Sequence, residues 1–68
     1  MIWTFTRDGA RLHYEIRKGA APGSYDIVIS RPGSQPEIER LDDASALIER
    51  SLTLQQGLIH EGWRVEPV

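Results

Sequence analysis

One dipeptide, Asp8-Gly9, limits the folds open to this chain more than any other feature. It stands between two stretches in which large apolar and polar residues alternate, "MIWTFTR" and "ARLHYEI". Asp-Gly is typical of a two-residue type I′ turn, because both central positions of that turn have positive φ. We therefore predict that the chain begins with an antiparallel hairpin.

The same turn predicts the register of the hairpin, because a two-residue loop fixes which residues lie opposite one another. The apolar pairs on one face are then Trp3 with Tyr14, Phe5 with Leu12, and Met1 with Ile16. A slip of one residue would move every apolar side chain to the other face. The remaining residues give that other face a mostly polar character: Ile2, Thr4, Thr6, Arg11, His13, Glu15 and Arg17.

Two further strands follow, each after a segment rich in turn-forming residues. Residues 25–31, "YDIVISR", place Tyr25, Ile27 and Ile29 on the core side and Val28 on the other side. Residues 37–41, "EIERL", are short and charged, as expected for a strand at the edge of a sheet. We expect Ile38 to be the contribution of this strand to the core.

A long helix is predicted after the fourth strand. Asp42 or Asp43 is its expected N-cap, because a carboxylate there accepts hydrogen bonds from free backbone donors. The apolar periodicity continues past Gly57, which falls on the solvent side, so we expect the helix to run to about Glu61. Gly62 then supplies the left-handed residue that ends it.

The elements predict one α+β domain over residues 1–68. Its expected architecture is an antiparallel four-strand meander, one long helix packed on one face of the sheet, and a short final extended segment in which Trp63, Val65 and Pro67 alternate. A chain this short removes only about 60% of its unfolded surface from water on folding. Because it has no cysteine for disulfides, association with another chain is the expected source of added stability.

The apolar stripe of the helix supports this expectation, because it spans about 160° where about 100° is enough to cover a small sheet. One flank holds Leu47, Leu54 and Leu58, and the other holds Ile48, Leu52 and Ile59. Polar residues lie between the two flanks. Either they bond to groups at a close crossing of helix and sheet, or they mark a seam with a second copy of the chain. The predicted seam consists of Leu47, Ser51, Leu54, Gln55 and Leu58.

The sequence contains no pattern typical of an enzyme. It lacks cysteine, a Gly-x-Ser-x-Gly nucleophile motif and a phosphate-binding loop. His13 and His60 are expected on different sides of the domain, which argues against a shared metal site. Strand-edge protection and helix capping account for the neighbouring acids in residues 37–43. We therefore expect no catalytic residues, no metal and no cofactor.

Basic residues give an alternative prediction, weak binding of single-stranded nucleic acid by the outer face of the sheet. Its candidate residues are Arg11, His13, Arg17, Lys18 and Arg31. The order of elements is similar to that of Whirly-type single-stranded-DNA binders, although no motif is shared. Against this alternative, the net charge is -2 and the isoelectric point is about 5.5, whereas nucleic-acid-binding domains are usually basic.

The leading prediction is a non-enzymatic domain that acts through protein association, as a homodimer. Composition is ordinary for a soluble globular domain, with 40% hydrophobic and 26% charged residues. No stretch is apolar for the roughly 18 residues that a membrane span needs. The start of the sequence lacks the charged and apolar regions of a secretory signal, so we expect Met1 to be the native start of a cytoplasmic protein.

Overall fold

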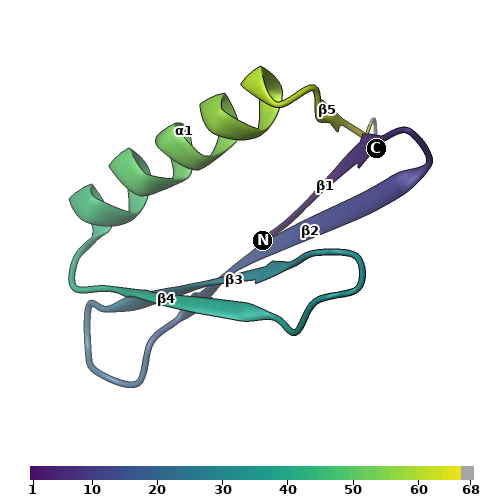
Figure 1. Ribbon diagram of the computed structural model, residues 1–68. Helices are drawn as coiled ribbons and strands as arrows, with labels where there is room; N and C mark the ends of the chain where they lie inside the picture. Colours follow the sequence, from purple (N-terminus) through teal and green to yellow (C-terminus); the bar gives the residue numbers. More distant parts are fainter. Residues whose placement is uncertain (67–68) are drawn as a thin grey trace.

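A computed structural model describes residues 1–66 and confirms the predicted α+β fold (Figure 1). The chain forms a meander of four antiparallel strands, then one helix, then a very short strand beside the first. The elements are β1 (Ile2–Arg7), β2 (Ala10–Lys18), β3 (Tyr25–Ser30), β4 (Glu37–Leu41), α1 (Ala44–His60) and β5 (Arg64–Val65). In the predicted final segment, Pro67 lies outside the described residues.

The sheet has the strand order β4-β3-β2-β1-β5, and every neighbouring pair is antiparallel. The predicted hairpin register is confirmed, with Trp3 opposite Tyr14 and Phe5 opposite Leu12. Asp8 and Gly9 both have positive φ, 50° and 81°, as the type I′ turn requires. The turn chemistry of two residues has therefore fixed the pairing of β1 with β2.

The core lies between one face of this sheet and α1. Its fully buried side chains from β1 to β3 are Phe5, Leu12, Tyr14 and Ile27. Ile29 and Trp63 are almost as buried, and the helix adds Leu54 and Leu58. Because the residues from the strands alternate along the chain, they share one face, and the opposite face carries no helix (Figure 1).

The prediction that Ile38 belongs to this core is wrong. Ile38 lies opposite Val28 in the β3–β4 ladder, and residues directly opposite one another share a face. Val28 points away from the helix, so Ile38 also lies on the outer face, where it is 69% exposed. The inner positions of β4 belong to Glu37, Glu39 and Leu41, of which Leu41 packs against the core.

Both predicted ends of α1 are confirmed. At the start, the Asp43 side chain accepts a hydrogen bond of 2.8 Å from the backbone N–H of Ala46. At the end, Gly62 has a φ of 95°, its N–H donates to the carbonyl of Ile59, and the N–H of Trp63 donates to the carbonyl of Leu58. These two bonds form a Schellman motif, which brings Trp63 and Leu58 together in the core.

Asp43 gives a direct test of the N-terminal cap. Asp43→Ala is expected to lower the free energy of unfolding by about 1 kcal/mol, because the Ala46 N–H loses its acceptor. Asp42→Ala removes the same charge from the neighbouring position and is the matched control, with an expected change below about 0.5 kcal/mol. Urea denaturation followed by circular dichroism measures both. Equal losses would mean that charge near the helix start matters and the hydrogen bond does not.

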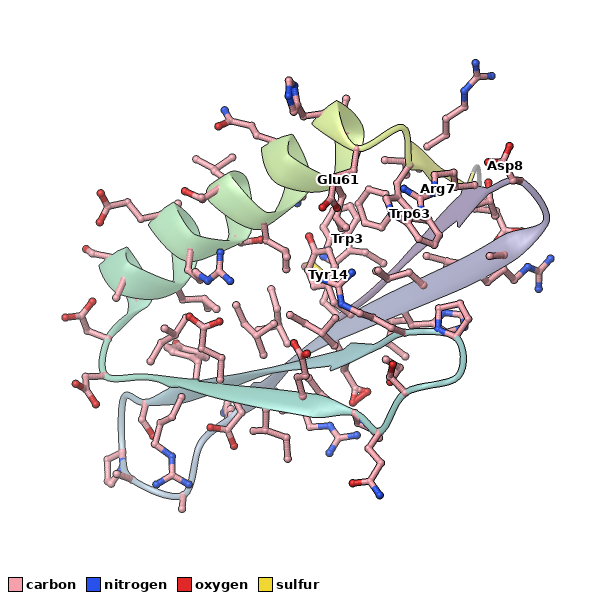
Figure 2. All side chains as sticks on the ribbon, viewed as in Figure 1. Trp3, Arg7, Asp8, Tyr14, Glu61 and Trp63 are labelled. Atoms are coloured by element: carbon pink, nitrogen blue, oxygen red, sulfur yellow. The ribbon has the colours of Figure 1, made fainter. Side chains whose placement is uncertain are left out.

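Arg7 joins the end of the helix to the first hairpin. Its Nη1 donates to the carbonyl oxygen of Glu61 at 2.9 Å, and its guanidinium lies 4.7 Å from the centre of the Trp63 ring (Figure 2). An arginine at this end also opposes the negative pole of the helix dipole. Through Arg7, the turn of the hairpin and the end of α1 hold each other in place.

Candidate interaction surface

The helix presents only one flank of its wide apolar stripe to the sheet. Leu54 and Leu58 on this flank are 7% and 2% exposed, and Leu47 packs against the same core cluster. A contact of Arg50 with the sheet is consistent with this orientation of the helix about its own axis. The Nε of Arg50 donates to both carboxylate oxygens of Glu39 on β4, at 2.8 and 2.9 Å.

The polar centre of the stripe faces the sheet and not the solvent. Tyr14 is fully buried, and its hydroxyl accepts a hydrogen bond from Nε2 of Gln55 at 2.5 Å. The same hydroxyl lies 3.4 Å from Oγ of Ser51. The five residues predicted for a seam with a second copy, Leu47, Ser51, Leu54, Gln55 and Leu58, thus lie on the side of the helix that packs on this chain's own sheet.

Gln55→Leu tests this placement. Without the Gln55 amide, the buried Tyr14 hydroxyl keeps only the 3.4 Å contact with Ser51, so we expect the free energy of unfolding to fall by about 1 to 2 kcal/mol. Adding Tyr14→Phe to the variant removes the stranded hydroxyl and should recover part of this loss. Denaturant titrations of the single and double variants measure it. An unchanged stability together with a changed oligomeric mass would instead place Gln55 at a subunit seam.

The other flank of α1 is left without a partner in this chain. Ile48, Leu52 and Ile59 are 61%, 55% and 58% exposed, and we call these three residues the exposed flank. At about 100° per residue they fall within about 40° of arc. From Ile48 to Ile59 they extend along the helix over eleven residue steps, or about 16 Å. Three large apolar side chains in one line are unlike the single exposed apolar residues that most protein surfaces carry.

The exposed flank points toward the β1 side of the sheet. Around the helix axis, Arg50 and the exposed flank lie on opposite sides of the residues that pack on the sheet. Arg50 is the one that contacts β4. Since β4 and β1 lie toward opposite ends of the strand order, the flank is turned toward β1. There Trp3 is half-buried, and its ring stacks on Tyr14 with a centroid distance of 6.0 Å (Figure 2).

Sequence reasoning found both flanks but did not identify the exposed one. The hydrogen bonds of Arg50 and Gln55 to the sheet show which flank packs on it. These contacts depend on where the helix crosses the sheet. One signal was present in the sequence. A stripe of about 160° on a helix that covers one small sheet leaves part of its apolar surface uncovered.

The five basic residues of the nucleic-acid alternative do not form one surface. Arg11, His13 and Arg17 alternate along β2 on the outer face. Lys18 lies opposite Tyr25, on the helix side of the sheet, and Arg31 lines a groove beside α1. The alternative stays a prediction, with three residues together where five were expected.

Carboxylates already engage two of those three residues. Arg11 lies 3.0 Å from Glu66, and Arg17 forms an ion pair with Glu15. The hydrogen bond from Arg17 and its positive charge lower the pKa of Glu15, and the same pair raises the pKa of Arg17. This pairing reduces the positive charge that the outer face offers to a phosphate backbone.

The described residues bring no cluster of catalytic groups together. His13 lies within hydrogen-bond distance of the Thr4 hydroxyl on the sheet, whereas His60 is exposed in the last turn of α1. Residues 1–66 contain no group of three or more His, Asp or Glu side chains placed to hold a metal ion. Over the same range, no helix is long and apolar enough to cross a membrane. The exposed flank is the apolar part of α1 that this chain's own sheet leaves uncovered.

Comparisons with known proteins leave this surface to be interpreted on physical grounds. The scan against family models, the search of curated proteins and the search of solved structures each return no significant match. The similarity to Whirly-type proteins accordingly rests on the order of elements alone.

Proposed function

We propose that this protein is a non-enzymatic association domain whose partner is a second copy of the same chain, bound through the exposed flank. The observation that carries the proposal is the exposure of Ile48, Leu52 and Ile59, each more than half open to solvent on one line of α1. A chain of 68 residues has little core to spare, so apolar surface of this size outside the core favours a role in contact.

The surroundings of the exposed flank favour a second copy as the partner. Over an arc of about 120°, the helix carries no charged residue. That arc holds Ala44, Ser45, Ile48, Leu52, Gln55, Gln56 and Ile59. Two copies can therefore meet face to face without opposing like charges, whereas a charged partner would find no complementary group there.

A two-fold axis gives this pairing a specific geometry. With the two helices antiparallel, Ile48 of one copy lies near Ile59 of the other, and Leu52 lies close to the axis. The helix dipoles then oppose each other, which is the favourable arrangement for adjacent helices. Each side of the contact is the same surface, as a closed dimer requires.

The size of the exposed flank predicts a weak dimer. Burying the exposed half of one such side chain gives about 1 kcal/mol, so six side chains give about 6 kcal/mol. Lost translational and rotational freedom offsets at least about 4 kcal/mol of this gain. This net gain of about 2 kcal/mol, with contacts of bordering groups such as Gln56 added, gives an expected dissociation constant of about 1 mM.

Sedimentation equilibrium tests the proposal. The average mass is expected to rise from the 7.7 kDa of one chain toward twice that value as concentration increases from about 10 µM to 1 mM. Amide shifts should move with concentration at Ile48, Leu52 and Ile59. A monomer mass over the whole range would contradict association. Shifts confined to Ile2 and Ile38 would place the contact on the outer sheet face instead.

A further inference from the structure

A groove on the other side of α1 has features that the proposed dimer does not use. It measures about 270 Å³ and lies between the helix and the residue that follows β3. The residues that line it are Arg31, Arg50, Thr53, Leu54, Gly57, Leu58 and Glu61. It therefore combines apolar side chains with charged ones.

Gly57 has no structural reason to be glycine in the isolated chain. It lies inside α1, where glycine is less favourable than alanine, and it does not adopt a left-handed φ. A Cβ built on Gly57 would have no atom within 4 Å, so no neighbouring group requires its absence. A glycine in such a place is accounted for if another molecule approaches the helix backbone closely at this point.

The two arginines beside Gly57 have unused donors. Arg50 donates to Glu39 through Nε alone, which fixes the orientation of its guanidinium and leaves the Nη hydrogens without an acceptor among residues 1–66. Arg31 is half-buried and forms no ion pair within the same residues. Guanidinium groups bind carboxylates and phosphates with paired N–H donors, so these two suit an oxyanion.

We propose that this groove binds the oxyanion group of a small molecule, a carboxylate or a phosphate, between Arg31 and Arg50, in the space that Gly57 leaves open beside the helix. Glu39 and Glu61 place two negative charges near the same groove. They limit the attraction, so binding is weak and depends strongly on Arg31, whose guanidinium has no carboxylate partner within residues 1–66.

Titration of the ¹⁵N-labelled protein with inorganic phosphate, and separately with acetate, tests this site. Sodium chloride at equal ionic strength is the reference for screening. Saturable shifts at the amide of Gly57 and at the side chain of Arg50 are expected with at least one of the two anions, and the anion that gives them identifies the class. Shifts that match those with chloride, or that never saturate, would overturn the proposal.

Three variants sharpen the test. Arg31→Gln should weaken binding at least fivefold, and Glu61→Gln should strengthen it. Arg11→Gln removes the same charge from the outer sheet face and should leave binding unchanged. If Arg11→Gln and Arg31→Gln weaken it equally, the anion senses only net charge and the site is absent.

The role of Gly57 is tested by filling the space above it. Gly57→Gln introduces a side chain that favours helix and occupies the groove, so the fold should persist while anion binding is lost. Circular dichroism confirms the fold in the same sample. Anion binding by Gly57→Gln equal to that of the parent chain would show that the groove is not the site.

Discussion

Leu58→Ala is expected to lower the free energy of unfolding by about 3 kcal/mol, the largest effect of any single substitution considered in this chain. Leu58 is 2% exposed and lies against Trp63, which the Schellman motif brings back onto the helix. Truncation removes a buried side chain and also opens a cavity that the neighbouring sheet cannot fill. Since a domain of this length has a total stability of about 3 to 10 kcal/mol, the variant is close to unfolding. Urea denaturation measures the loss.

Leu52→Ala is the matched control, because it makes the same change on the same helix. Leu52 is 55% exposed, so at a concentration where the chain is monomeric its truncation should cost less than about 1 kcal/mol. The contrast between the two leucines reports which flank of α1 packs on the sheet. Similar losses at both positions would mean that the helix is rotated relative to the structure described above.

Leu52→Glu is expected to weaken self-association at least tenfold while leaving the monomer folded. With the proposed two-fold axis near Leu52, the substitution places two carboxylates close together in a contact that excludes water. Like charges and lost apolar burial act in the same direction, and about 1.4 kcal/mol is enough for a tenfold change. Sedimentation equilibrium at the concentration where the parent chain is half dimeric measures the effect.

Thr53→Glu provides the control for added charge. Thr53 is the next residue along α1, is exposed, and lies about 100° further around the helix, outside the uncharged arc. The variant has the same net charge as Leu52→Glu but should dimerise like the parent chain. If both variants lower the mass equally, general charge repulsion opposes association and the exposed flank is not the contact.

The sequence was sufficient for those parts of the fold that local chemistry determines. Asp8 and Gly9 specify a turn of known length, and turn length sets the register of β1 and β2 without reference to the rest of the chain. The ends of α1 are similarly local, because Asp43 and Gly62 each act on backbone groups within one helical turn. In both cases, the atoms that decide the structure are close together in the sequence.

Features that depend on distant contacts were harder to predict. The prediction for Ile38 is wrong because the six residues between β3 and β4 leave the register of that pair open, and the register decides which face each side chain occupies. The orientation of α1 depends on Tyr14, whose hydroxyl reaches Gln55 more than forty residues later. The periodicity of the sequence shows that the helix has two apolar flanks, but it does not identify which flank packs on the sheet.

The pairing of β5 with β1 has a consequence for how the chain acquires its structure during synthesis. One side of the β1 ladder is completed by Arg64 and Val65, which lie about sixty residues further along the chain and are therefore synthesised after it. Such long separations between contacting segments slow the search for the native state. Until β5 docks, the amide groups along that side of β1 are open to pairing with the edge of another chain.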